Sequence, residues 1–286
     1  MDGLLIIDKP PGPTSHDAVY QAKRLLKTKV GHTGTLDPLA AGVLPLLLGR
    51  ATRLARFFQG EDKEYLAEIR LGQTTDTYDG EGRVLEQKPV PDLSLDEMEE
   101  TLDLFRGEIR QRAPRYSAIK VQGRKLYELA RKDIEVTPPE RTVQINTLEI
   151  LEWGTDRLRV RVECSTGTYV RSLAHDIGQQ IGCGAFLTSL ERTRSGAFHL
   201  SQAVPLADLA DSWQNALIPL DQLLPEIPRL NLDEATATRV RHGNAFAATA
   251  PALNSDCRLF HNGQLIAIGH SAGELIHPEV VLDPAP

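Results

Sequence analysis

The sequence contains few cysteines. Cys164, Cys183 and Cys257 lie far apart, their number is odd, and no C-x-x-C pair occurs. This pattern argues against a zinc site and against a framework of disulfides. It is typical of a protein from a reducing compartment, and we expect a cytoplasmic location.

Long hydrophobic runs are absent as well. The longest, at residues 44–48, is far too short to span a bilayer. Residues 1–9 have neither a basic n-region nor a long apolar h-region, so we expect no signal peptide. The sequence also lacks a G-x-G-x-x-G motif, a P-loop and the H-x-H or H-E-x-x-H patterns of metal sites. We therefore expect neither a redox cofactor nor a bound metal.

What is present is ordinary for a globular protein. The chain has 286 residues, of which 41% are apolar and 25% charged. This length predicts one large domain, or one large and one small domain, with a sizeable core. We find no internal repeat and no low-complexity segment.

The first 226 residues mix strand and helix signals without a regular βαβ repeat. Helix starts are indicated by Thr14 with Asp17, and by Ser94 with Glu97, which form a capping-box pattern. Apolar residues alternate with polar ones in the strand candidates, and a helical pattern follows residues 165–167. The strand candidates are residues 4–7, 65–71 and 158–164. This mixture predicts an α+β catalytic domain at residues 1–226 with a mixed, mostly antiparallel sheet.

The remaining part, residues 227–286, has a different character. Residues 232–243 are typical of a short helix that ends in glycine. Residues 259–268 contain Asn262–Gly263 between two apolar runs, which predicts a hairpin with a type I′ turn. Residues 280–282 indicate a last strand. We expect a small, β-rich C-terminal domain.

Charge is distributed unevenly along the chain. The formal net charge of −7 disfavours, taken alone, a nucleic-acid-binding protein. Residues 76–103 contain ten acidic and two basic residues, whereas residues 106–132 contain nine basic and two acidic residues. We call residues 106–132 the basic segment. It could face a polyanion such as RNA, or it could be an ordinary solvated surface.

Residues 31–45 form the segment with the clearest chemical signal. They read Gly-His-Thr-Gly-Thr-Leu-Asp-Pro-Leu-Ala-Ala-Gly-Val-Leu-Pro. Pro38 disfavours helical geometry at Asp37, and the glycines permit sharp turns and close approach of backbone. Such a loop can hold one carboxylate out into a cleft. Asp-Pro is also a common way to begin a turn, so the residues alone leave both interpretations open.

This loop closely resembles the motif of the TruB family of pseudouridine synthases. The resemblance continues in the same order along residues 3–200, and the C-terminal part is more loosely similar to the family's small PUA-type domain. The matching segments are residues 3–15, which contain Gly-Leu-Leu-Ile-Ile-Asp-Lys-Pro, the loop at 31–45, residues 62–65 and 71–77, Gln111 with residues 114–120, residues 164–173 and residues 190–196.

The resemblance assigns roles to particular residues. Asp37 matches the family's catalytic aspartate, the expected nucleophile, and Arg171 matches an arginine that would keep this carboxylate ionised. The positions that would bind the uridine or its RNA are His32, Tyr65, Tyr169 and Leu190. Without the family, Tyr65 and Leu190 would be interpreted as core residues and Arg171 could equally be a surface arginine. Lys9 we expect to be structural.

The implied activity is the conversion of uridine 55 in the T-loop of tRNA to pseudouridine. The uridine must leave its stack to meet Asp37. The carboxylate could attack C1′ of the ribose, attack C6 of the base, or start a route through a glycal, and the sequence does not choose among these. The reaction needs no cofactor. We expect a monomer that binds the T-arm of tRNA, without a membrane or an obligate protein partner.

Three other functions remain possible at this stage. The first is an RNA-binding or tRNA-chaperone module without catalysis. The second is a pseudouridine synthase that depends on a guide RNA, since the same superfamily includes such enzymes. The third is a metal-dependent hydrolase using His32 and Asp37, although the sequence offers no further ligands in a recognisable pattern.

Overall fold

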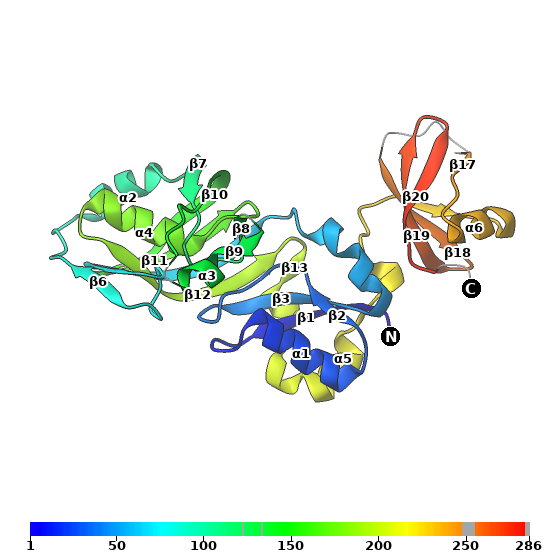
Figure 1. The fold of residues 1–286 in the computed structure, drawn as a ribbon, viewed down its shortest axis with the longest axis horizontal. Helices are drawn as coiled ribbons and strands as arrows, with labels where there is room; N and C mark the ends of the chain where they lie inside the picture. The colour runs from blue at the N-terminus through cyan, green and yellow to red at the C-terminus, as the bar shows by residue number, and fades with distance from the viewer. Residues whose placement is uncertain (122, 133, 248–254, 284–286) are drawn as a thin grey trace.

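The structure is a computed structural model that describes residues 1–121, 123–132, 134–247 and 255–283. The molecule is elongated, with a long sheet and its helices at one end and a small β-rich unit at the other (Figure 1). The parts of the predicted C-terminal domain at 248–254 and 284–286 lie outside the described residues.

The long sheet is mixed and mostly antiparallel. Among the described strands, only the β1–β14 and β3–β12 pairs of this sheet are parallel. Its central path runs in the order β14 (Val204–Pro205), β1 (Gly3–Lys9), β3 (Ala41–Leu48), β12 (Ala185–Ser195), β4 (Lys63–Leu71), β11 (Arg157–Cys164), β10 (Glu140–Trp153) and β7 (Gly107–Arg112). Short strands lie off this path: β2 (Val30–His32) pairs with β3, β13 (Phe198–His199) with β12, and β15 (Ile218–Pro219) with β1.

Helices pack against one face of this sheet. They are α1 (Ser15–Leu26), α2 (Leu95–Asp103), α4 (Val170–Ile181) and α5 (Leu209–Ala216), with the short 3-10 helix η3 (Leu206–Asp208) before the last of them. Two other 3-10 helices, η2 (Leu200–Gln202) and η4 (Leu220–Gln222), contribute leucines to a second hydrophobic cluster. Both predicted capping boxes are present: Thr14 caps α1 with Asp17, and Ser94 caps α2 with Glu97. The main core lies between these helices and the sheet.

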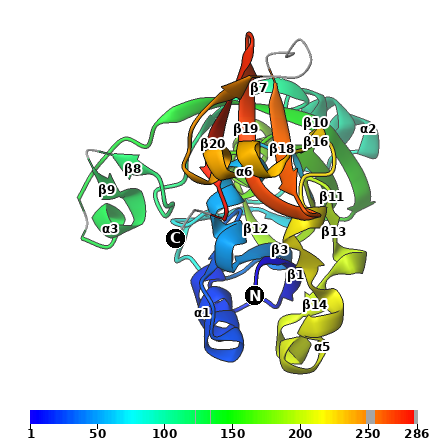
Figure 2. The same ribbon diagram turned by 90° about the vertical axis from the view of Figure 1, so that its right-hand side faces the viewer.

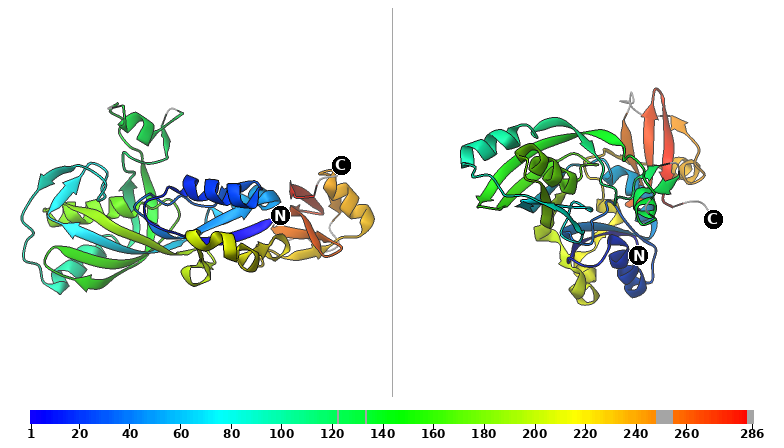
Figure 3. Two further views of the ribbon diagram at one scale, coloured as in Figure 1. Left: turned by 90° about the horizontal axis from the view of Figure 1, so that it is seen from below. Right: turned by 60° about the vertical axis from the view of Figure 1, so that its left-hand side comes forward.

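Two small hairpins project from the long sheet. One consists of β5 (Gln73–Thr75) and β6 (Val84–Gln87). The other consists of β8 (Lys120–Val121) and β9 (Arg124–Lys125), followed by α3 (Leu126–Ala130). The second hairpin and α3 belong to the basic segment, and they stand away from the body of the molecule (Figures 2 and 3).

The C-terminal unit is a second, five-stranded sheet with one helix. Its order is β16 (Arg229–Asn231), β18 (Asp256–His261), β19 (Gln264–Ala272), β20 (Leu275–Val281) and β17 (Phe246–Ala247), and its helix is α6 (Glu234–Arg241). The predicted hairpin is confirmed, because β18 pairs with β19 across Asn262 and Gly263. Both turn residues have positive φ, 49° and 79°, as a type I′ turn requires.

The two sheets share a hydrophobic core. Alternating residues of β1 point to opposite faces, so Leu5 and Ile7 join the core under the helices, while Leu4 and Ile6 point the other way. There they pack in one cluster with residues of the 3-10 helix η1 (Gly49–Phe58) and of the C-terminal unit, including Phe260 and Ile268. This shared core fixes the C-terminal unit against the long sheet.

Candidate active site

The loop between β2 and β3 presents Asp37. Its position is set by the start of α1, where the Ser15 hydroxyl donates a hydrogen bond to the Leu36 carbonyl (2.9 Å) and accepts one from the Leu36 amide (2.7 Å). The Gly12 amide donates to the Pro38 carbonyl (2.8 Å). The residues on both sides of Asp37 are therefore anchored, and the carboxylate is held at a defined place although its side chain remains 33% exposed.

Arg171 is the partner of this carboxylate. It is the second residue of α4 and is only 4% exposed. Its Nε donates to Asp37 Oδ2 at 2.8 Å, and its other nitrogens donate to the carbonyls of Thr77 and Tyr116, both at 3.0 Å. Among the described residues Asp37 Oδ1 has no hydrogen-bond partner, so one oxygen of the carboxylate is bound to the arginine and the other is left available.

A second carboxylate completes this network. Asp79 Oδ2 lies 3.4 Å from Arg171 Nη1, and Asp79 is 4% exposed. Its Oδ1 accepts hydrogen bonds from the Thr77 hydroxyl (2.5 Å) and the Glu81 amide (3.1 Å). The buried guanidinium is thus compensated by two carboxylates and two carbonyls, which offsets the cost of burying a charge. Sequence reasoning did not identify Asp79 as a site residue. It counted Asp79 only among the ten acidic residues of positions 76–103, which we call the acidic stretch.

Two of the predicted uridine-binding residues lie on the neighbouring strands β4 and β12. Tyr65 on β4 and Leu190 on β12 are 9% and 7% exposed and belong to the main core. Burial raises the pKa of the Tyr65 hydroxyl, which interacts with the guanidinium of Arg192. The negative charge of Asp37 adds to the rise in the pKa of the Tyr65 and Tyr169 hydroxyls that burial causes. These residues can form the wall of a base-binding site beside Asp37.

Tyr169 is fixed through its backbone. Its amide donates to Gln111 Oε1 (2.7 Å), and Gln111 Nε2 donates back to the Tyr169 carbonyl (3.0 Å). The side chain is half-buried, which raises the pKa of its hydroxyl, and the Arg141 guanidinium lies 5.6 Å from its ring centroid. Tyr169 is therefore fixed as the N-cap residue of α4, two positions before Arg171.

His32 lies on β2 at the entrance to the loop. It is half-buried, and its Nδ1 has no hydrogen-bond partner among the described residues. Burial, assisted by the positive charges of Arg192 and His16, lowers the pKa of the ring. A neutral imidazole has one donor and one acceptor nitrogen, and the Nδ1 of His32, unpartnered among the described residues, is itself buried rather than open to solvent.

Two further buried cations support the site, and only one of them was assigned a role from the sequence. Lys9, predicted to be structural, is fully buried and donates to the carbonyls of Pro10 (2.7 Å) and Pro13 (2.8 Å). Arg192, which was not singled out, is 1% exposed and donates to the carbonyls of Val43 (2.7 Å) and Gly34 (3.1 Å). Together they hold the loops on either side of Asp37.

The nine cations of the basic segment fall into two groups. Three are paired with carboxylates: Arg106 with Glu99 and Asp103, and Arg110 and Arg112 with Glu140. No ion pair within the described part of the chain neutralises the other six, of which five are exposed: Arg115, Lys120, Arg124, Arg131 and Lys132. The second group is therefore the part of the segment best suited to contact phosphates.

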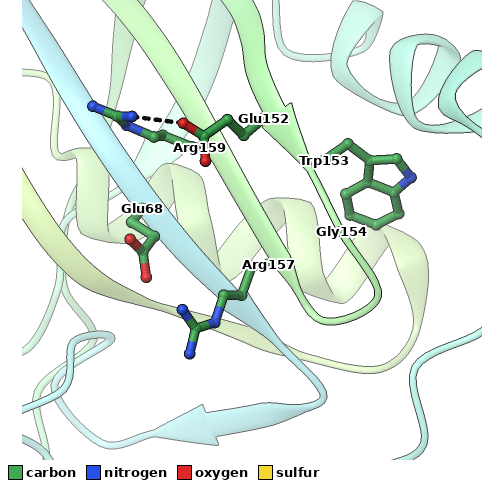
Figure 4. Close-up of a pocket in the computed structure, with 6 residues that line it drawn as sticks. All are labelled: Glu68, Glu152, Trp153, Gly154, Arg157 and Arg159. Carbon is green, nitrogen blue, oxygen red and sulfur yellow. Dashed lines mark hydrogen bonds and ion pairs between the residues drawn. The ribbon is translucent and has the colours of Figure 1, made fainter.

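A hollow on the long sheet lies elsewhere. It measures about 220 Å³ and is lined by side chains at the tip of the β10–β11 hairpin and by Glu68 of β4 (Figure 4). Arg159 and Glu152 form an ion pair at its edge (2.7 Å). None of the predicted site residues lines it, so it is not the candidate active site.

Among the described residues, no group of three or more His, Cys, Asp or Glu side chains is arranged to hold a metal ion. His32 and Asp37 thus lack the further ligands that a metal-dependent hydrolase would need. No helix within the same residues is long and apolar enough to cross a membrane.

Comparison with solved structures confirms the predicted fold class. The chain superposes on the structure of "a Cbf5-Nop10-Gar1 Complex" with a TM-score of 0.74 and 28% identity, covering 99% of this chain and 85% of the other. For the structure of an "H/ACA RNP bound to a substrate RNA containing 2'-deoxyuridine" the TM-score is 0.72 at 27% identity, with the same coverage.

The sequence comparisons give closer relatives. The chain is 44% identical to "tRNA pseudouridine synthase B" of Solibacter usitatus, over 99% of this chain and 100% of that protein. It is 44% identical to the protein of the same name from Aromatoleum aromaticum, over 96% and 90%. A profile described as "TruB family pseudouridylate synthase (N terminal domain)" matches residues 23–170, and the profile of the "tRNA pseudouridylate synthase B C-terminal domain" matches residues 171–227. This chain belongs to the TruB family of pseudouridylate synthases.

Proposed function

We propose that this pseudouridine synthase acts on tRNA and isomerises uridine 55 of the T-loop, with Asp37 as its nucleophile. The observation that carries the proposal is the ion pair between the half-open Asp37 and the buried Arg171. Full-length relatives named tRNA pseudouridine synthase B support tRNA as the substrate. The enzyme works as a monomer in the cytoplasm, without a guide RNA.

The reaction is an isomerisation. The N1–C1′ bond breaks, a C5–C1′ bond forms, C5 loses a proton and N1 gains one. Nothing is oxidised, and one ionised carboxylate is sufficient to start the sequence by attack on the nucleoside. Asp37 Oδ1 is the oxygen free for this attack, while Oδ2 stays bound to Arg171. The arginine holds the carboxylate in a fixed orientation before the substrate arrives.

The base must leave its stack in the RNA to reach Asp37. Extrusion costs a few kcal/mol, and stacking on an aromatic ring offsets about 1–3 kcal/mol of it. In our proposal Tyr65 provides this stacking, Tyr169 and Leu190 complete the pocket wall, and His32 holds the flipped nucleotide. Tyr65 and Leu190 are buried, and His32 and Tyr169 are half-buried, so in this proposal a bound uracil is shielded from water between bond breakage and bond formation.

The domain division remains part of the proposal. We assign residues 1–226 to catalysis and residues 227–286 to a PUA-like RNA-binding domain. The basic segment contacts the phosphates of the T-arm through its unpaired cations.

The decisive test is tritium release from tRNA labelled at C5 of uridine, with purified protein, EDTA and no guide RNA. We expect release from tRNA with uridine 55 and none from tRNA with cytidine at that position. The absence of turnover without guide RNA would favour a guide-dependent synthase, which the likeness to the H/ACA structures keeps as the rival.

The matched variant is Asp37→Asn. It keeps the size and shape of the side chain, so we expect turnover to disappear while tRNA binding stays within about tenfold, because many phosphate contacts supply affinity. Asp92→Asn, an exposed carboxylate of the acidic stretch, serves as the control and should be fully active. Persisting activity in Asp37→Asn would leave the protein without its assigned nucleophile.

A further inference from the structure

Two rings outside the predicted site lie face to face beside the Arg171 network. The centroids of Tyr78 and His175 are 3.8 Å apart, and their planes differ by 11°. Tyr78 follows β5, and His175 lies on α4 one turn after Arg171. Neither residue belongs to the motifs discussed above as binding the base or supplying the nucleophile.

In the sequence, Tyr78 lies between Thr77 and Asp79, and Arg171 contacts both of these neighbours. The Thr77 carbonyl accepts a hydrogen bond from Arg171 Nη1 at 3.0 Å, and the Asp79 carboxylate lies 3.4 Å from the same nitrogen. Both acceptors must face the guanidinium at once. Any rotation of the turn at residues 77–79 would therefore remove both from Arg171.

The backbone of this turn is held in an unfavourable conformation. Tyr78 has a φ of 64°, which few residues other than glycine adopt, and an isolated turn would leave it readily. Two backbone bonds to β12 hold it, from the Leu187 amide to the Tyr78 carbonyl (3.0 Å) and from the Gly80 amide to the Leu187 carbonyl (2.9 Å). The ring stack supplies the attachment on the other side, to α4.

Hydrogen bonding at Nδ1 does not account for the position of the His175 ring. Its Nδ1 is buried without a hydrogen-bond partner in the described structure, and burial lowers the pKa of the ring, so the neutral form is favoured. A neutral imidazole packs flat on a phenol ring with little cost of desolvation. Because His175 and Arg171 are four residues apart on one helix, they lie on the same face of α4.

We propose that the Tyr78–His175 stack is a positioning device that fixes the turn at residues 77–79 on α4, so that Thr77 and Asp79 hold Arg171 in line with Asp37. The stack touches neither the RNA base nor the carboxylate. It acts through Arg171, and the inference rests on the proposed function, in which the Asp37–Arg171 pair does the chemistry.

The test separates catalysis from binding. We would measure the single-turnover rate of tritium release at saturating tRNA, the Kd for tRNA and the melting temperature for each variant. In Tyr78→Gly the left-handed backbone is accommodated but the ring is lost. We expect a rate about 10- to 100-fold lower with a Kd close to wild type, the size of effect typical of a misplaced catalytic group. His175→Ala should behave alike, and the double variant should lose no more than either single variant.

Conservative variants distinguish the loss of the positioning contact from a loss of folding. Tyr78→Phe and His175→Phe keep two stacked rings and should restore most of the rate. Phe198→Ala removes one ring from the Phe58–Phe198 pair, which lies in the other core, and should lower the melting temperature without changing the rate at saturation.

The inference would be overturned, while wild type stays active, by a wild-type rate in Tyr78→Gly and His175→Ala, or by a loss of rate that is matched by an equal loss of tRNA affinity, seen as a raised Kd. A slow His175→Phe would also contradict it, because the imidazole itself would then be required. An inactive wild-type protein would instead refute the proposed function, and the positioning role would fall with it.

Discussion

Arg171 serves more acceptors than a lysine can. Its planar fork reaches Asp37, Asp79 and the carbonyls of Thr77 and Tyr116, whereas an ammonium is a point charge with three donors. We expect Arg171→Lys to keep tRNA binding and to lose at least about 100-fold in the single-turnover rate. Arg161→Lys, on an exposed arginine paired with Glu149, is the control and should be active. Near-normal turnover of Arg171→Lys would reduce its role to folding.

Tyr65 combines a ring for stacking with a hydroxyl beside Arg192. We expect Tyr65→Phe to bind tRNA but to lose most activity, if the hydroxyl assists removal of the C5 proton as part of the proposed function, and Tyr65→Ala to be worse by the loss of about 1–3 kcal/mol of stacking. Single-turnover rates of the two variants measure the two contributions separately. If Tyr65→Ala reacted at the wild-type rate, the stacking role would be wrong.

Among single residues, sequence reasoning proposed Asp37 and Arg171, which the structure brings together, but it did not identify the residues that hold them in place. Asp37 and Arg171 are 134 positions apart, and only resemblance to a family connected them before the structure showed the contact. Asp79 and Arg192 were missed because their partners are a guanidinium and backbone carbonyls distant in the chain. Neither contact produces a periodic or local signal in the sequence.

Lys9 connects elements rather than acting on a substrate. It ends β1 and donates to carbonyls of the proline loop that follows, with a weaker contact to Pro38 beside Asp37 (3.5 Å). Burial lowers its pKa from 10.5 to about 8. Between these values the unfolded chain holds a proton that the folded chain has released, so the folded state gains stability as the pH rises.

We therefore expect Lys9→Met to remove a pH-dependent part of the free energy of unfolding. Relative to the variant, wild type should gain stability from pH 8 to pH 10.5 and show no further change below pH 8 from this residue. Urea denaturation at several pH values measures the difference, and Lys23→Met on the exposed face of α1 controls for the loss of one charge. Parallel stability curves for wild type and Lys9→Met would contradict a buried, destabilised ammonium.

The elements with local signals were predicted well. The capping boxes located α1 and α2, and alternation located β4 and β11 because each buries one face. Strand β3 was noticed only as an apolar run, since seven of its eight residues are buried and no alternation remains. Strand β12 was not predicted, although it lies at the centre of the sheet, because its pairing with β3 and β4 is decided by tertiary contacts.

The whole molecule is more unified than its sequence indicated. The change of composition near Pro225 predicted a separate small appendage, yet the C-terminal unit shares a core with β1 and β3. Arg258 strengthens this junction by donating to the carbonyls of Leu223, Pro225 and Ile227 in the connecting segment. Sequence periodicity could not show this, because β1 and β18 supply residues to one core from opposite ends of the chain.

Charge is also organised at the scale of the whole molecule. The negative net charge of the whole chain conceals the positive charge of the basic segment. Within that segment, some cations are neutralised by carboxylates and others are not. Arg110 and Arg112 share Glu140, whereas no ion pair among the described residues involves Lys120, Arg124 or Lys132. If the segment closes over the T-arm, the unpaired group makes the phosphate contacts.

Replacing Lys120, Arg124 and Lys132 with alanine should weaken tRNA binding and flatten its salt dependence. Each lost phosphate contact lowers the slope of log affinity against log salt by roughly 0.7–0.9, so the triple variant should lose up to about 2–3 units. The single-turnover rate at saturating tRNA should change much less, because Asp37 and Arg171 remain.

The control removes the same total charge from the sheet, by replacing Arg70, Arg159 and Arg161, which are paired with Asp156, Glu152 and Glu149. Its slope should match wild type. Equal slopes for all three proteins would mean that the basic segment is a solvated surface, and equal losses in both triple variants would mean that net charge acts at a distance.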